Sequence, residues 1–200
     1  FESPWYKYHP GSGTDALAKQ FLQKAVSYAQ VVMDSGNYKF DTDFRSLFGS
    51  ETQQGHEAIM FRSYSADLKV THCIASYSNL QEAQARSANL SFLKSVRCTD
   101  GKPYTSSTVA NHDSWRLQDM AVTRDPRFEA TFWDEPTTAA TGVYCVKFID
   151  RVGPTYAYNG QALPAKYGSS TNTNGFPVIR YAEVCMNYIE AKRELELSYG

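Results

Sequence analysis

The stretch that decides the fold is FPVIRYAEVCMNYIEAKRELELSYG, residues 176–200. Its apolar residues recur at the spacing of an amphipathic helix, so we predict a helix over about 177–198. Pro177 stands at the predicted start, where a missing N–H group costs nothing. The apolar stripe of this helix contains Val178, Tyr181, Ala182, Cys185, Tyr188, Ile189 and Leu195.

A second helix is predicted over about 14–35, within TDALAKQFLQKAVSYAQVVMDSGNY. Thr14 or Asp15 can cap its start, and Gly36 suits the left-handed residue that follows a helix. Both predicted helices mix alanines with large aromatics, as helical-hairpin repeats of the tetratricopeptide kind do. We expect Tyr28, Tyr181 and Tyr188 to lie in the core. The apolar stripe of the second helix contains Ala18, Phe21, Leu22, Ala25, Tyr28, Ala29 and Val32.

The region between the two helices, about 40–175, is predicted to be irregular and loop-rich. Strand patterns cover 57–64, with Ile59 and Phe61 on one side, and 141–150. Asp100-Gly101 is a tight-turn signal, and Asp125-Pro126 ends a short predicted helix. The remaining predictions are a short helix over 40–48 and a long loop over 153–175.

Composition excludes several classes of protein. The net charge is −1 and the pI is near 6.5, which does not suit a nucleic-acid-binding face. The four cysteines are far apart and form no CxxC pair, so disulfides and buried free thiols both stay open. Fourteen per cent of the residues are aromatic, and 14 of them are tyrosines. Because tyrosine is amphipathic, this composition fits recognition of an uncharged ligand.

The common catalytic motifs are missing from the sequence. There is no HExxH, GxSxG, P-loop or GxGxxG pattern, and the four histidines share no metal-ligand spacing. The neighbouring acids Asp134 and Glu135 read as loop charges rather than as a pair facing a substrate. In RDPRF, residues 124–128, Asp125 is expected to cap a turn or pair with Arg124 or Arg127. We therefore predict no catalytic residue, no metal and no cofactor.

Six stretches in order resemble the SusD/RagB family. They are VVMDSGNYKF with FRSLF, EAIMFRSY, FLKSVRCTDGKPY, TRDPRFEATF, TGVYCVKF and VIRYAEVCMNYIEAKREL. The resemblance implies a mostly α-helical fold with a few short strands. In that fold, tetratricopeptide-like helix pairs support a loop-rich half that holds the ligand. It also implies that residues 1–200 form one partial SusD/RagB-like domain, an internal portion or a shortened member.

The function implied by this resemblance is binding without catalysis. Family members are lipid-anchored proteins of the bacterial outer membrane that capture glycans at the cell surface. They pass the glycan to a partner TonB-dependent transporter of the SusC-like type. Three alternatives stay open: a peptide-binding member, a protein-interaction scaffold and, least favoured, a glycan-cleaving enzyme.

A glycan site would combine aromatic rings, which stack on sugar faces, with polar side chains, which bond hydroxyl groups. Such residues are expected on loops that the helical scaffold holds. A half-buried packing role fits each aromatic candidate equally well. The candidates are Trp115, Trp133, Tyr104, Tyr156 and Tyr158, with the polar residues Asn111, Arg116 and Asn159.

Overall fold

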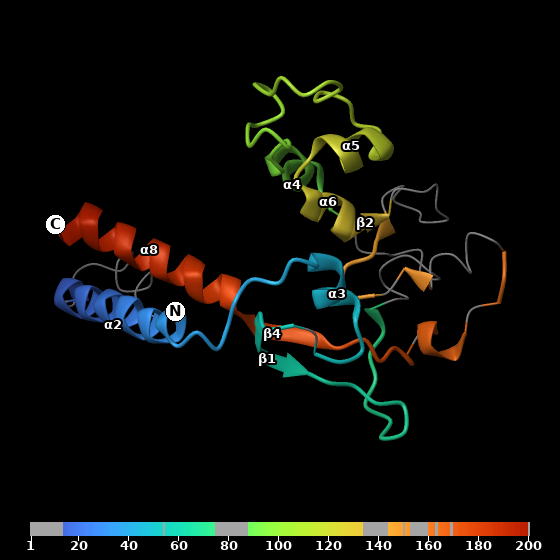
Figure 1. Cartoon of the computed structure of the whole chain (residues 1–200), viewed down its shortest axis with the longest axis horizontal. Helices are drawn as coiled ribbons and strands as arrows, with labels where there is room; N and C mark the ends of the chain where they lie inside the picture. The colour runs from blue at the N-terminus through green and yellow to red at the C-terminus, as the bar shows by residue number, and fades with distance from the viewer. Residues whose placement is uncertain are drawn as a thin grey trace. The chain divides into compact units, whose positions relative to one another are not determined.

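A computed structural model describes most of the chain (Figure 1). The described residues are 14–53, 55–74, 88–133, 144–149, 151–152, 160–162, 164–168 and 170–199, without the side chains of residues 14, 15, 133 and 144. They divide into two compact units, which are described separately. Unit 1 comprises residues 1–41, 55–60 and 178–200, and unit 2 comprises residues 42–54 and 61–177. The prediction of one domain over residues 1–200 stays a prediction.

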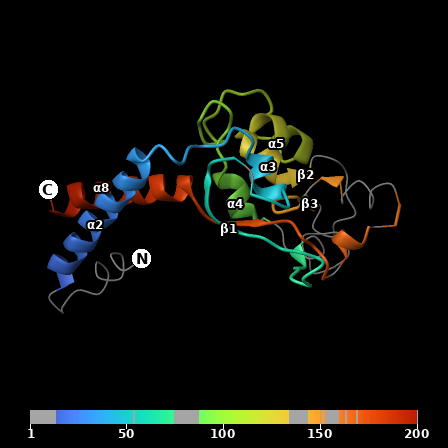
Figure 2. The ribbon, with the colours of Figure 1, turned by 60° about the horizontal axis from the view of Figure 1, so that its bottom comes forward.

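Unit 1 is built on two long helices, α2 (Thr14–Asp34) and α8 (Tyr181–Tyr199). They pack against each other and cross at an angle, as Figure 2 shows. Small residues line the contact: Ala18, Ala29 and Ala191 are buried, together with Leu22. Alanine lets two helix backbones approach closely, so the alternation of Ala with larger apolar residues explains this pairing. Both predicted long helices are thus present.

The expectation for the helix tyrosines was wrong. Tyr28 is 68% exposed, because it lies one residue before the buried Ala29 and therefore about 100° around the helix from it. Tyr181 and Tyr188 are only half-buried. Tyr181 packs edge-on against Phe40 with ring centroids 5.1 Å apart. The apolar stripe is narrower than the sequence pattern indicates.

The start of the last helix also differs from the prediction. Residues Phe176–Arg180 form strand β4, which pairs with β1 (Ala58–Arg62) in a two-stranded sheet, and α8 begins only at Tyr181. Pro177 therefore belongs to a strand and not to a helix start. A proline is tolerated there because a two-stranded sheet leaves each strand one free edge. The strand predicted over 57–64 is confirmed as β1.

Glu57 joins three parts of unit 1. Its buried carboxylate accepts a hydrogen bond from the backbone N–H of Asp41 at 3.0 Å and pairs with Arg180 at 2.5 Å. Its carbonyl oxygen accepts the N–H of Tyr181, the first residue of α8. The Asp41 carboxylate in turn accepts the N–H groups of His56 and Glu57. One glutamate thus fixes the loop after α2, the end of β4 and the start of α8.

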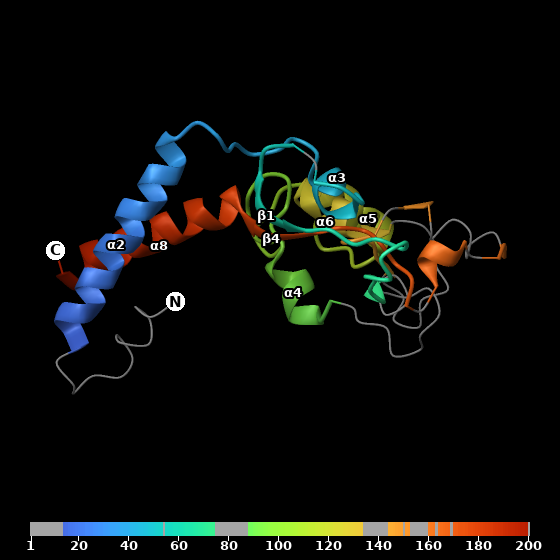
Figure 3. The same cartoon turned by 90° about the horizontal axis from the view of Figure 1, so that it is seen from below.

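Unit 2 contains short helices whose starts follow from capping residues. Asp43 caps α3 (Phe44–Gly49), Asn89 caps α4 (Leu90–Ser95) and Asp125 caps α6 (Pro126–Thr131). In each case the side chain accepts a backbone N–H two or three residues later. The remaining helix, α5 (Leu117–Thr123), ends just before Arg124. Figure 3 shows α3 and α5 near α6, and both pack on it.

The core of unit 2 lies between these helices. Leu93, Met120, Phe128 and Phe132 are buried together. Strand β2 (Phe132–Trp133) pairs antiparallel with β3 (Tyr144–Cys145), with Phe132 opposite Cys145. The helix predicted over 40–48 and the strand predicted over 141–150 are both shorter in the structure than predicted.

Three sequence predictions in unit 2 are corrected. The helix expected over 40–48 begins at Phe44, because Asp43 caps it, and Phe40 is 58% exposed. Of the strand expected over 141–150, the described residues form only the two-residue strand β3. Phe148 has a positive φ of 68°, which does not fit an extended strand. Asp125-Pro126 ends a helix as expected but also begins α6, since proline suits the first helical position.

Buried asparagines anchor the described part of the loop predicted over 153–175, where a short 3-10 helix, η2, covers Ala165–Tyr167. Asn172 exchanges two backbone hydrogen bonds with His72, each 3.0 Å long. The side chain of Asn174 donates to the carbonyl of Gly49 at 2.6 Å. These bonds join segments of unit 2 that lie 100 or more positions apart in the sequence.

We expect Gly55→Ala to destabilise the chain more than Gly36→Ala does. Both glycines have positive φ, 62° and 68°, a conformation that costs an L-residue about 1–2 kcal/mol. A Cβ at Gly36 would meet nothing within 4 Å, whereas one at Gly55 would lie 2.0 Å from the Asp41 carboxylate. The Asp41 hydrogen bonds would then be lost as well, at about 1 kcal/mol each. Urea unfolding of the two variants measures the difference, and equal losses would contradict this account.

We also expect the stability of the chain to fall between pH 7.5 and 5.5 through His72. Burial lowers the pKa of His72 below its ordinary value of 6.5, against the weaker opposing effect of its bond to Asn174. The unfolded chain therefore binds more protons in this window, so stability is full above about pH 7 and decreases as the pH falls. The ring also needs its neutral form, because Nε2 donates to the Asn174 carbonyl and Nδ1 accepts the N–H of Ile74.

The measurement is the free energy of unfolding against pH for the original chain and for His72→Gln. The variant is expected to show a flatter profile over this window. Parallel profiles would remove His72 as the cause.

Candidate ligand-binding site

The loop between α4 and α5, which we call the aromatic loop (residues 98–116), is the best-organised candidate site in unit 2. Its turn contains Gly101 with a φ of 77°, as the Asp100-Gly101 signal predicted. The Asp100 carboxylate accepts the backbone N–H groups of Lys102 and Thr108 and the hydroxyl of Ser107 at 3.0–3.1 Å. The bond from Thr108 is the main reason that the pKa of Asp100 lies below its ordinary value. The carboxylate thus holds both sides of the loop's first half.

A short antiparallel ladder fixes the base of this loop. Residues 97–99 run beside 123–125: the N–H of Asp125 donates to Arg97 at 2.8 Å, and the N–H of Thr99 donates to Thr123 at 3.0 Å. Cys98 and Arg124 face each other in this ladder. We call residues 97–99 and 123–125 the central ladder. Because side chains alternate along extended chain, Cys98 and Arg124 point to one side, and Arg97 and Asp125 point to the other.

Arg124 is the buried centre of the site. It is 1% exposed, and its Nη1 donates to the carbonyl of His112 at 2.8 Å and contacts the sulfur of Cys98 at 3.4 Å. Its guanidinium carbon lies 5.7 Å from the ring centroid of Trp115 and 6.0 Å from that of Tyr104. Nε and Nη2 have no hydrogen-bond partner in the described part of the chain. Nη1 also donates to the hydroxyl of Thr123 at 3.2 Å, and the two π systems add further stabilising contacts to this charge.

Tyr104 and Trp115 form an aromatic pair above Arg124. Their ring centroids are 5.1 Å apart at an interplanar angle of 73°, which is a favourable edge-to-face geometry. Trp115 is 39% exposed and Tyr104 is half-buried. His112 also supports the pair, because its Nδ1 donates to the carbonyl of Tyr104 at 2.6 Å. The pair is therefore held from below by a cation and keeps part of its surface open to solvent.

Two predicted polar residues lie on the same loop. Asn111 is exposed with a φ of 61°, and its carbonyl accepts the N–H of Ser114 at 3.1 Å. Arg116 is exposed and precedes α5, and its N–H donates to the hydroxyl of Ser114. Ser114 in turn donates to Asp119 at 2.5 Å. The second half of the loop is thus tied to the first turn of α5.

Four of the eight predicted site residues therefore come from this one loop: Tyr104, Asn111, Trp115 and Arg116. The backbone of Trp133 is in β2, and its side chain lies outside the described part of the structure. Tyr156, Tyr158 and Asn159 lie outside the described residues. The ligand role of all eight residues stays a prediction.

Sequence reasoning missed Arg124 as a part of this site. The sequence predicts that Asp125 caps a turn or pairs with an arginine, and Asp125 does pair with Arg127 through two hydrogen bonds of 2.8 Å. That pairing, led by the side-chain bond to Arg127, also lowers the pKa of Asp125. The available signal is an arginine directly before Asp125-Pro126, where the predicted helix ends. An arginine that turns inward from such a corner needs buried partners, which the aromatic loop provides.

Three other features of the described residues bear on function. No group of three or more His, Cys, Asp or Glu side chains is placed to hold a metal ion there. All four cysteines are free thiols, so no disulfide links them in this structure. None of the described helices has the length and apolar character needed to cross a membrane.

Comparison with known proteins gives two matches. Residues 135–198 match the model of the SusD family (SusD_RagB). The fold is similar to that of a SusD-like carbohydrate-binding protein from Bacteroides fragilis, with a TM-score of 0.63 and 18% sequence identity. The match covers 92% of this chain and 38% of that protein, so the chain spans well under half of its length. No curated protein sequence matches significantly.

The helix pair, the short strands and the overall match define a mostly α-helical protein of SusD-like fold. The family match over the C-terminal third of the chain, residues 135–198, agrees with this fold.

We expect Arg124→Met to loosen the aromatic loop. The change leaves the carbonyl of His112 without its donor and removes the cation from both rings. The free energy of unfolding should fall by about 1–3 kcal/mol. Acrylamide should also quench the fluorescence of Trp115 more strongly. A parallel measurement on Trp115→Phe shows which part of the signal of the three tryptophans comes from Trp115. Arg193→Met, at an exposed α8 position, is the control, and a similar result for both variants would contradict the role of Arg124.

Proposed function

We propose that this chain is part of a glycan-binding protein and that the aromatic loop contacts the sugar. The observation that carries the proposal is the half-open pair of Tyr104 and Trp115, held over a buried arginine. Sugar rings present apolar C–H faces that pack on aromatic rings. A preordered loop loses little entropy when it binds. The similar Bacteroides fragilis protein, described as carbohydrate-binding, supports the same class of ligand.

Polar groups beside the pair complete this proposal. Asn111 and Arg116 are exposed on the same loop, where an amide and a guanidinium can bond sugar hydroxyls. Neither catalysis nor a cofactor has a part in this mechanism: the protein binds and releases an unchanged oligosaccharide. Trp133, Tyr156, Tyr158 and Asn159 remain candidates for further contacts.

The cellular role is proposed from the family. The full-length protein would be lipid-anchored at the outer-membrane surface and would pass oligosaccharide to a SusC-like TonB-dependent transporter. The peptide-binding alternative uses the same aromatic surface and is an outcome of the test below. The scaffold alternative has one observation of its own, the exposed apolar residues on α2 and α8. These are Leu17, Tyr28, Val31, Met186, Ile189 and Leu197.

We expect Trp115→Ala to weaken oligosaccharide binding by about thirtyfold, which corresponds to about 2 kcal/mol for a central aromatic contact. Isothermal titration calorimetry with a panel of neutral oligosaccharides measures this, because its signal does not depend on the removed tryptophan. Tyr104→Ala should have a smaller effect in the same direction. Tyr28→Ala, an exposed aromatic on α2, is the matched control and should bind as the original chain does.

Three outcomes would count against the proposal. Saturable binding of a peptide pool with silence across the oligosaccharides would favour the peptide-binding alternative. Loss of binding in Tyr28→Ala but not in Trp115→Ala would move the site to the helix pair. New reducing ends during incubation would indicate the enzyme alternative.

A further inference from the structure

Unit 2 contains a pocket on the other side of the central ladder. Its volume is about 310 Å³, at the small end of the range for ligand sites. Arg97 and Asp125 line it, whereas their ladder neighbours Cys98 and Arg124 lie beneath the aromatic pair. The pocket is therefore separate from the site described above, although the same few residues build both.

The wall of the pocket is aromatic. Phe44 from α3, Phe92 from α4, Phe128 from α6 and Phe132 from β2 contribute to it. Phe128 and Phe132 are buried and fixed by the core, with ring centroids 4.9 Å apart. Phe92 is 48% exposed and packs edge-on to Phe132 at 6.3 Å. Such a wall accepts a flat apolar face.

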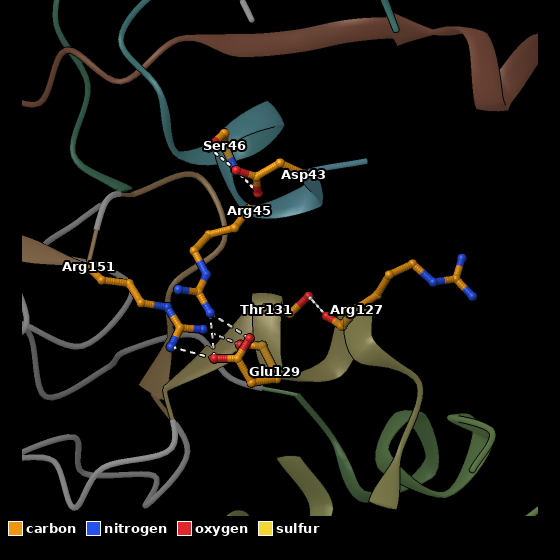
Figure 4. A network of polar contacts seen from close by, with 7 residues as sticks. All are labelled: Asp43, Arg45, Ser46, Arg127, Glu129, Thr131 and Arg151. Atoms are coloured by element: carbon orange, nitrogen blue, oxygen red, sulfur yellow. Dashed lines mark hydrogen bonds and ion pairs between the residues drawn. The ribbon is translucent and has the colours of Figure 1, made fainter. Parts of the chain in front are cut away.

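The polar lining is dominated by positive charge. Among the described lining residues, the three cations Arg97, Arg127 and Lys147 accompany one carboxylate, that of Asp125. Arg127 already donates two hydrogen bonds to the Asp125 carboxylate, and Figure 4 shows the Arg127 side chain directed away from Glu129. The Arg97 guanidinium is exposed and makes no hydrogen bond or ion pair with the described residues. Because the Asp125 carboxylate is occupied by Arg127, it does not neutralise the Arg97 guanidinium.

The surroundings on α6 do not neutralise this charge. Glu129 pairs with two arginines at once: with Arg45 at 2.5 Å and with Arg151 at 2.8 Å (Figure 4). The Glu129 carboxylate is therefore already occupied by two cations. Lys147 lies 4.2 Å from the ring centroid of Phe48 and so is fixed over the aromatic cluster of α3. An anionic group in the pocket thus meets no unpaired carboxylate among the described lining residues.

We propose that this pocket binds a sugar that carries an acidic group, with Arg97 as the main contact of the carboxylate. A guanidinium recognises a carboxylate through two parallel hydrogen bonds, and Arg97 has its donors available. The apolar face of the sugar ring packs on Phe92 and Phe132. The choice of a glycan rests on the proposed function, whereas the acidic group rests on the pocket alone.

The test compares two ligands that differ only in charge: tri-galacturonate and the matching trisaccharide in which each carboxyl is reduced to an alcohol. Calorimetry at low salt with the 200-residue chain is expected to show tighter binding of the acidic trisaccharide by roughly tenfold to a hundredfold. Arg97→Met should remove most of that difference. Lys94→Met is the matched control, because it removes a nearby exposed charge on α4 that does not line the pocket.

The outcomes separate this inference from the proposed function. An acidic preference that survives Trp115→Ala but not Arg97→Met supports the pocket. Equal affinity for the two trisaccharides, or equal effects of Arg97→Met and Lys94→Met, overturns it and leaves neutral glycan binding at the aromatic loop intact. Competition by phenylacetate as effective as that by galacturonate would overturn the sugar part. Absence of binding to either trisaccharide and to the neutral panel would overturn both.

Discussion

The central ladder is the constraint on which the candidate sites of unit 2 depend. Two short extended segments pair for only a few residues, yet their alternation sends Cys98 and Arg124 to one side and Arg97 and Asp125 to the other. A shift of the register by one residue would exchange the two sets. The aromatic pair would then lose its buried cation, and the pocket would lose its available guanidinium. A single backbone register therefore orders two surfaces of different chemistry.

The parts of this structure that the sequence predicts are those with local causes. Gly36 and Gly101 adopt the positive φ angles that their contexts indicate, and Asp125 caps a helix that begins with proline. The periodicity of α2 and α8 is equally local. In contrast, the prediction that a helix starts at Pro177 is wrong, because proline suits both a helix start and an edge strand. Only the distant partner β1 decides between these conformations, and a pattern within residues 176–200 contains no information about it.

The candidate site was predictable to the same extent. Loop-like composition predicts Tyr104, Asn111, Trp115 and Arg116, and the structure brings them onto one loop. It does not predict Arg124, because Arg124 is buried beneath two rings that lie 9 and 20 residues earlier in the chain. Tyr28 shows the opposite error, because an apolar spacing pattern does not define the edge of a buried stripe. Exposure depends on the partner helix, which is about 160 residues away.

Unit 1 is assembled from segments at both ends of the chain, and unit 2 is inserted between them. Glu57 and Arg180 close this arrangement where the inserted chain leaves and returns. The entropy of closing a long loop grows only with the logarithm of its length, by about 0.6 kcal/mol for each doubling. Insertions and deletions in unit 2 therefore have little effect on the pairing of α2 and α8. The loops of unit 2 can therefore vary in length as well as in sequence while the helix pair of unit 1 stays intact.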